Sequence, residues 1–247
     1  MTLRLLTYNI RHGGAGREAP LTAVIRACEP DLVVLQEATR PDVVDRVARA
    51  AAMQVWASRR DNSLGFMSRV PIAEHAWHQP RGSRHAFLEI VLGDRACRVF
   101  GVHLSAVHAA WTERRRVREL RALLAAIKQH QEGVHLLAGD FNTLAPGELL
   151  DVRQLPLRLR PFVWLSGGAI RWRTIQEVLD ARYADAFRLQ HPTAAGLTFP
   201  TWNPHVRLDY VFVPASQASR VQSCHVVTTD PAPTASDHYP LVADVEA

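Results

Sequence analysis

The chain has 247 residues, of which 47% are hydrophobic and 21% charged, and its formal net charge is +5. This composition supplies enough apolar side chains for a sizeable core and excludes a disordered chain. The modest basic charge permits a phosphate-bearing partner without requiring one.

The three cysteines, Cys28, Cys97 and Cys224, lie far apart and have no metal-type spacing. They indicate a reducing compartment and argue against a disulfide framework. The apolar run after Met1 is too short for a signal peptide, and no run approaches the ~20 residues that span a bilayer. We therefore expect a soluble cytoplasmic monomer without a transmembrane segment or an evident protein partner.

The first 52 residues predict two strands and two helices in alternation. Apolar runs indicate strands at residues 3–9 and 32–37, and the second run ends on a carboxylate, Glu37. Pro20 and Pro41 stand where helices are expected to begin, over residues 21–28 and 41–52. This alternation is typical of an α/β protein.

Residues 54–104 consist of short apolar runs separated by turn residues. We expect an antiparallel meander with turns at residues 70–71, 82–83 and 93–94, and a last strand over residues 97–104 that contains His103. The clearest helical periodicity follows at residues 111–131. The arginines between positions 114 and 121 of this helix are expected to form a solvated face.

A short apolar run at residues 134–138 predicts a buried strand that stops at Gly139. The glycine frees the backbone to turn, so Asp140 and Asn142 are expected at the rim of the sheet, where ligand crevices form in α/β proteins. The segment Gly-Asp-Phe-Asn taken alone is equally consistent with an Asx-type turn.

The second half of the chain is less regular. We expect a helix over residues 174–181, a loop over 198–204, and strands over 207–213, 221–227 and 241–245. Residues 143–196 otherwise show little periodicity. Because no linker or low-complexity segment interrupts the chain, we expect one domain over residues 1–247.

Polar residues recur at the ends of these apolar strands, and their set contains no thiolate. A carboxylate or amide on a core strand is costly to bury unless it is paired or binds a metal. Oxygen ligands favour Mg²⁺ or Mn²⁺, and such an assembly suits phosphate-ester hydrolysis. The residues are Asn9, Glu37, His103, Asp140, Asn142, Asp209, Asp237 and His238.

The same positions resemble the endonuclease/exonuclease/phosphatase superfamily, which includes deoxyribonuclease I, exonuclease III, inositol-phosphate 5-phosphatases and sphingomyelinases. Each motif is short, but six occur in the expected order across residues 7–238. The resemblance implies a four-layer α/β sandwich, two central β-sheets flanked by helices, with the site at one end. The motifs are Thr7-Tyr8-Asn9, Leu35-Gln36-Glu37, Val102-His103-Leu104, Gly139-Asp140-Phe141-Asn142, Arg207-Leu208-Asp209-Tyr210 and Ser236-Asp237-His238.

The resemblance also implies roles for the metal-binding side of the site. Glu37 would be the principal ligand of Mg²⁺ or Mn²⁺, with Asn9 and Asp237 helping to hold the ion or its waters. Asp140 would orient the attacking water, and Asn142 would hold that water and a phosphate oxygen.

Two histidines and an aspartate would complete the catalytic set. The resemblance implies that His238 contacts the phosphate or exchanges protons, and that Asp209 orients it and raises its basicity. His103 would bind the scissile phosphate, although a strand histidine can also be a satisfied core residue. Arg207, beside Asp209, is expected to form a structural salt bridge.

The substrate is less defined by the sequence. Abasic-site endonucleases typically carry aspartate where this chain has Arg11, and tyrosine where it has His103, so abasic-site specialisation is not expected. Arginines and tryptophans in the irregular segment suit a nucleic-acid backbone and unpaired bases, but they are equally consistent with packing and solvation. The candidate substrate contacts are Arg171, Trp172, Arg173 and Trp202.

The sequence favours a nuclease that hydrolyses DNA phosphodiester bonds. A phosphomonoesterase would use the same core with a different rim. A lipid phosphodiesterase of the sphingomyelinase kind would need an exposed apolar loop, for which residues 161–165 are the candidate. A non-catalytic module that binds phosphate or nucleic acid is the alternative of another class.

Overall fold

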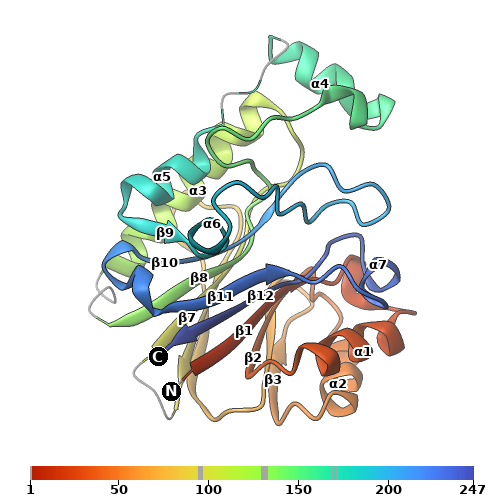
Figure 1. Cartoon of the computed structure of the whole chain (residues 1–247), viewed down its shortest axis with the longest axis vertical. Coiled ribbons are helices and arrows are strands. Elements are labelled where there is room, and N and C mark those ends of the chain that lie inside the picture. The colour runs from red at the N-terminus through yellow and green to blue at the C-terminus, as the bar shows by residue number, and fades with distance from the viewer. Residues whose placement is uncertain (1, 94–96, 129–132, 168–169, 171) are drawn as a thin grey trace.

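The computed structural model describes residues 2–93, 97–128, 133–167, 170 and 172–247. Within these ranges the strands form two mixed sheets of six strands each, which lie face to face with helices on their outer faces (Figure 1). This arrangement confirms the predicted α/β class and the four-layer sandwich.

The first sheet is built around the N-terminal strand. Strand β1 lies parallel to β2 and antiparallel to β12, so the two ends of the chain are joined in one sheet. In spatial order the sheet consists of β11 (Val221–Val226), β12 (Leu241–Glu246), β1 (Thr2–Asn9), β2 (Leu32–Gln36), β4 (Gly65–Ser68) and β3 (Val55–Ser58).

The second sheet is built around the strand that carries Asp140. Strand β8 lies parallel to β7 and antiparallel to β10. In spatial order this sheet consists of β5 (Ile72–His78), β6 (Phe87–Leu92), β7 (Cys97–His103), β8 (Val134–Asp140), β10 (Asp209–Pro214) and β9 (Tyr183–Asp185).

The largest apolar cluster fills the space between the two sheets, with residues such as Leu5, Val34 and Leu136 fully buried. The outer face of the first sheet packs against α1 (Glu18–Cys28), α2 (Pro41–Ala50) and α7 (Ala232–Ala235). The outer face of the second packs against α3 (Ala110–Ile127) and α5 (Thr174–Asp180). The central strands of both sheets are therefore buried on both faces, which explains their nearly continuous apolar runs, whereas the edge strand β5 keeps exposed residues.

The remaining short elements lie mainly between residues 143 and 220. They are α4 (Arg160–Leu165), α6 (Ala186–Gln190), η3 (Val152–Gln154), η4 (Leu157–Leu159) and η5 (Ala215–Arg220), while η1 (His12–Gly14) follows β1. Helix α4 projects away from the sandwich (Figure 1). None of the helices in the described ranges has the length and apolarity needed to cross a bilayer.

The structure corrects three expectations about the elements. The runs after residue 54 do not form one meander: β3 and β4 join the first sheet, and the turn at residues 70–71 carries the chain into the second. Strand β8 does not stop at Ala138 but continues through Gly139 to Asp140. Helix α3 ends at Ile127, and residues 129–131 of the predicted helix lie outside the described ranges, as does Asp94 of one predicted turn.

Gly139 is required by close approach of a neighbouring strand rather than by a turn. A Cβ atom at this position would lie 1.8 Å from the carbonyl oxygen of Val102 on β7. Its φ of 154° is also one that side-chain-bearing residues rarely adopt. The missing side chain thus lets β7 and β8 pair up to their last residues.

Candidate active site

Three of the predicted residues stand in one row across the second sheet. In the strand register, Asp140 at the end of β8 pairs with His103 at the end of β7 on one side and with Asp209 at the start of β10 on the other. Adjacent strands lie about 5 Å apart. The sheet itself therefore brings these side chains together from positions far apart in the sequence.

The first sheet contributes Asn9 and Glu37 at the same end of the sandwich. Asn9 ends β1, and its Nδ2 donates to Glu37 Oε1 at 3.3 Å and to Asp140 Oδ2 at 3.1 Å. Glu37 follows β2 directly and adopts a left-handed backbone conformation with φ 57°. Such strained conformations cluster at functional sites. The amide of Asn9 thus joins the two sheets at the point where both carry carboxylates.

Asp209 and His238 form a buried pair. His238 Nδ1 lies 2.8 Å from Asp209 Oδ2, and its Nε2 lies 3.8 Å from Asp140 Oδ2. Burial lowers the pKa of His238, but Asp209 and Asp140 raise it by more, to about 10. The imidazole is therefore held protonated, with Asp209 fixing its orientation and its Nε2 side facing Asp140.

The surroundings of Asp140 favour its neutral form, whereas those of His238 favour the charged form. Burial raises the pKa of Asp140 to about 7, and although His238 opposes this rise, Asp209 adds to it. Its Oδ1 accepts from the backbone N–H of Asn142 at 2.8 Å. A carboxyl group whose pKa lies near neutrality can both take and release a proton at working pH.

Asn142 is placed by the loop that follows β8. It adopts φ 52°, a left-handed conformation that asparagine tolerates, and its Nδ2 donates to the carbonyl of Leu104 at 3.0 Å. This bond ties the Asn142 loop to the end of β7. Asn142 is therefore held at the ends of the strands that carry Asp140 and His103.

His103 is neutral in this setting. Burial lowers the pKa of His103 to about 4, even though Glu37 opposes the shift. Its Nδ1 lies 3.0 Å from Ser63 Oγ, and its Nε2 lies 3.8 Å from Asp140 Oδ2. When Ser63 donates to Nδ1, the Nε2–H becomes available as a donor on the Asp140 side.

Asp237 lies at the rim of this cluster. Its carboxylate faces Arg11, with Arg11 Nε 3.3 Å from Asp237 Oδ2. The Arg11 guanidinium also lies 6.0 Å from the ring centre of Trp202, whose side chain is 68% exposed. The predicted substrate contact Trp202 is thus beside the cluster, joined to it by an arginine.

The donor set around Glu37 fits an oxygen-preferring cation. Burial raises the pKa of Glu37, but opposing contributions, among them hydrogen bonds from the His12 backbone N–H and the Asn9 amide, lower it overall, so the carboxylate is held ionised. The Glu37 side chain is 29% exposed, and it faces the Asn9 amide. In the present orientation Asn9 donates to Glu37, while Asn9 Oδ1 accepts from the N–H of Arg11 at 3.0 Å. Glu37 thus offers ionised oxygen ligands, and Asn9 orients them.

One other group of side chains within the described ranges could hold a metal ion. Ligand atoms of Asp140, Asp209 and His238 lie within 4.8 Å of one another. His238 is held protonated by its two carboxylate neighbours, and a protonated imidazole cannot ligate a metal. This group therefore suits proton transfer better than metal binding, and Glu37 better fits the cation.

The sequence motifs did not point to several residues that support the site. Ser63 contacts His103, and the His85 ring centre lies 6.1 Å from that of His103. Arg17 donates to the carbonyls of Ile10, Arg11 and Ala235, which joins the loop after β1 to the segment before His238. These residues lie in turns and loops without a repeating pattern, so their proximity arises only from the fold.

The other predicted substrate contacts have different settings. Trp172 is partly buried against the cluster of Leu144 and Leu208, with its ring 5.8 Å from that of His108. Arg173 is exposed at the start of α5. Arg171 lies outside the described ranges.

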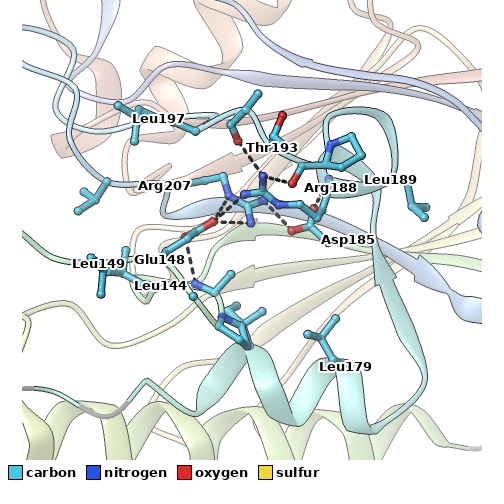
Figure 2. Close-up of a pocket in the computed structure, with 18 of the residues that line it drawn as sticks. Leu144, Glu148, Leu149, Leu179, Asp185, Arg188, Leu189, Thr193, Leu197 and Arg207 are labelled. Atoms are coloured by element: carbon cyan, nitrogen blue, oxygen red, sulfur yellow. Dashed lines mark hydrogen bonds and ion pairs between the residues drawn. The ribbon is translucent and has the colours of Figure 1, made fainter.

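A cavity of about 660 Å³ has an ion network among its lining residues (Figure 2). Arg207 is 1% exposed and contacts Asp185 at 2.6 Å and Glu148 at 2.8 Å, while Arg188 contacts Glu148 at 3.0 Å. The charges of this network satisfy one another. Arg207 therefore makes the structural salt bridge expected from the sequence, two residues before Asp209.

Comparison with known proteins identifies relatives of this arrangement. A sequence model described as Endonuclease/Exonuclease/phosphatase family matches residues 6–238. No curated protein sequence matches the chain.

Among solved structures, an AP endonuclease from Archaeoglobus fulgidus has 15% identity and a TM-score of 0.75, covering 99% of this chain and 100% of that chain. A 3' phosphatase from Neisseria bound to product DNA hairpin has 18% identity and a TM-score of 0.72, with the same coverage. D. rerio TDP2 complexed with single strand DNA product has 17% identity and a TM-score of 0.70, covering 100% and 99%. At these identities the likeness shows the fold.

Proposed function

The chain belongs to the Endonuclease/Exonuclease/phosphatase family, and we propose that it is a divalent-metal-dependent phosphodiesterase that hydrolyses DNA. The observation that carries this proposal is the meeting of an ionised Glu37 with the Asp140–His238–Asp209 group at one end of the two sheets. Family membership supports phosphoester hydrolysis, and this arrangement supplies the groups that such a reaction needs.

The metal would be held by Glu37, with Asp237 and Asn9 contributing. Bound Mg²⁺ or Mn²⁺ polarises the phosphoryl oxygen and offsets the charge of the carboxylates. Asp237, whose carboxylate lies 3.3 Å from Arg11 at the rim of the cluster, would help to hold the ion. Asn9 keeps Glu37 and Asp140 at a fixed separation through its two donated bonds.

The chain's own residues would manage the proton and the phosphate. Asp140, whose pKa lies near 7, orients water and accepts its proton at Oδ2. His238, held protonated by Asp209, donates from Nε2 to the phosphate or to the leaving oxygen. His103 adds a neutral donor, and Asn142 holds the loop against the end of β7.

Two observations support DNA as the substrate. Structural neighbours are described as a 3' phosphatase and a TDP2 bound to DNA products, and as an AP endonuclease. Arg11 and the exposed Trp202 stand together at the rim, a combination that suits a phosphate and an unpaired base. We infer that a strand enters beside Trp202.

The test is hydrolysis by purified wild-type protein in Mg²⁺ and in Mn²⁺ across a panel of substrates. The panel contains end-labelled single-stranded, duplex and abasic DNA, 4-nitrophenyl phosphate as a monoester, and sphingomyelin vesicles. Asp140→Asn is the inactive comparison, with loss of about a hundredfold or more expected for a general base. The exposed Asp180→Asn is its matched control.

Cleavage of DNA that is lost in Asp140→Asn and retained in Asp180→Asn supports the proposal. Hydrolysis confined to the monoester or to sphingomyelin would contradict DNA as the substrate and identify one of the two alternatives. Binding of DNA without turnover of any substrate would contradict catalysis.

A further inference from the structure

A groove of about 810 Å³ lies between α3, the start of α5 and the end of α4. Helices α3 and α5 lie side by side on the outer face of the second sheet (Figure 1). Trp111, Arg114 and Arg118 of α3 line one side of the groove, and Arg173 lines the other.

The groove has a net positive charge. Arg114, Arg118 and Arg173 are exposed, and within the described ranges none of them has a carboxylate at ion-pair distance. The sequence alone favoured a solvated face for the helix arginines, but the structure places two of them opposite Arg173 across a concave surface.

The two carboxylates that line the groove do not offset this charge. Glu113 is 2% exposed and contacts the buried Arg116 at 2.9 Å. Glu177 contacts Arg121 through two bonds of 2.6 and 2.8 Å. Each carboxylate therefore has its own arginine, and the three remaining guanidinium groups face the groove.

An aromatic ring stands at one end of the groove. The Trp111 side chain is 40% exposed, and one edge of it is supported by Phe162 of α4, with ring centres 5.7 Å apart. The N–H of Ala110 donates to Ser166 Oγ at 2.9 Å, which holds α4 against the N-terminus of α3. The ring is thus fixed in place with part of its surface free for stacking.

The groove is connected to the active site through Glu113. Its Oε1 accepts from the N–H of Arg173 at 2.7 Å, and its Oε2 accepts from Thr143 at 2.9 Å. Thr143 directly follows Asn142. One buried carboxylate therefore fixes both the arginine side of the groove and the loop that follows Asn142.

We propose that this groove binds the phosphates of a single-stranded segment of nucleic acid, with one base stacked on Trp111. Arg114 and Arg118 are four residues apart on one face of the helix, about 6 Å along its axis, so they can contact successive phosphates. Arginine grips phosphate oxygens in a bidentate manner, and stacking on an aromatic ring needs an unpaired base. The inference rests on the proposed function, since it treats the groove as an extension of the site for the same substrate.

The test is binding of a fluorescein-labelled single-stranded oligonucleotide, measured by anisotropy in EDTA from about 50 to about 200 mM salt. We compare the wild type with Arg114→Gln/Arg118→Gln and with Trp111→Leu. The matched control is Arg26→Gln/Arg182→Gln, which removes two exposed arginines on other elements. Each groove variant is expected to bind about tenfold more weakly at the lowest salt. The double arginine variant should also reduce the slope of log K against log salt by about 1.4, or 0.7 for each lost phosphate contact.

Equal affinity and equal slope for the groove variants and the control would overturn the inference, as would the absence of oligonucleotide binding by the wild type. Binding of anionic lipid vesicles in its place would identify the groove as a lipid surface. Hydrolysis of bis(4-nitrophenyl) phosphate by the wild type is measured in parallel. If that hydrolysis is absent while the groove variants weaken DNA binding, the proposed function is contradicted but the inference that the groove binds nucleic acid is supported. If it is present and the variants bind as the wild type does, only the groove inference fails.

Discussion

Asn9 and Asp140 belong to different sheets, yet Asn9 Nδ2 lies 3.1 Å from Asp140 Oδ2. The same nitrogen donates to Glu37 at 3.3 Å. Asn9 is 1% exposed and Asp140 is 1% exposed, so this contact lies in the interior where the two sheets meet. Asn9 therefore links Glu37, which is proposed to hold the metal, with Asp140, which is proposed to orient the water.

Asn9→Ala is therefore expected to lower kcat by about 10- to 100-fold, because hydrogen bonds to charged groups contribute roughly 1.5–3 kcal/mol each. Steady-state cleavage of labelled DNA measures the effect. Asn203→Ala removes an exposed asparagine that contacts Gln154 and should leave kcat unchanged. Equal rates for Asn9→Ala and the wild type would show that the link between the sheets is not needed for catalysis.

Asp209→Asn is expected to lower both the catalytic rate and the stability of the fold. Asp209 is 1% exposed, and its Oδ2 lies 2.8 Å from His238 Nδ1. Removing the charge breaks this buried pair and removes the group that keeps His238 protonated. The rate should fall by about 10²- to 10⁴-fold, and the melting temperature should fall as well. Calorimetry and kinetics on one preparation give both values, and a variant as active and as stable as the wild type would refute this role.

His108 is expected to make the fold sensitive to mild acid. Burial lowers the pKa of His108 to about 4, and Arg116 acts in the same direction. Because the folded-state pKa lies below the unfolded value, only the unfolded chain takes up this proton as the pH falls from about 6.5 towards about 4. The free energy of unfolding is therefore highest above about pH 6.5 and decreases as the pH falls from about 6.5 towards about 4.

The comparison that isolates this effect is His108→Phe against the wild type. By linkage, the wild type should lose about 2 kcal/mol more of its free energy of unfolding than His108→Phe between about pH 7.5 and about pH 5. Urea unfolding at the two pH values measures it, with the exposed His225→Phe as a matched substitution. Parallel pH profiles for wild type and His108→Phe would contradict the prediction.

Arg207 is expected to act on stability through its buried network. Its side chain is 1% exposed and contacts both Asp185 and Glu148, so Arg207→Met leaves two carboxylates without this partner. Breaking a buried pair costs about 3 kcal/mol or more. Arg153→Met breaks an ion pair with Asp151 whose arginine is 88% exposed, and the change there should stay below about 0.5 kcal/mol. If urea unfolding shows that the two substitutions lower the free energy of unfolding equally, the buried network stabilises the fold no more than an exposed ion pair does.

Much of the fold could be predicted from the sequence because the central strands are buried on both faces. Apolar runs that end on a polar residue, such as those ending at Asn9 and Glu37, located strands and their termini within a residue or two. The sheet to which a strand belongs could not be predicted in the same way. Only a short turn separates β4 from β5, and tertiary packing alone assigns β4 to the first sheet and β5 to the second.

The site residues at strand ends could be predicted from the sequence. The residues that reach the site from loops could not. His103, Asp140 and Asp209 were identified separately, and the register explains why they meet. Ser63 and Arg17 stand in turns, so nothing in their spacing pointed to His103 or to the loop after β1. Gly139 was interpreted as a turn signal, because a glycine required by a close strand looks the same in a sequence.

The most direct test of a metal-dependent phosphodiesterase is single-turnover cleavage of labelled DNA by wild type and Glu37→Gln, with Mg²⁺ and with EDTA. Loss of groups that merely orient a metal ligand typically costs 10- to 100-fold, so Glu37→Gln should lose at least about a hundredfold and require more Mg²⁺. Glu29→Gln, a matched change at an exposed residue, should behave as the wild type. We expect cleavage only with metal and intact Glu37. Equal cleavage in EDTA, or by Glu37→Gln at the wild-type rate, would contradict the account.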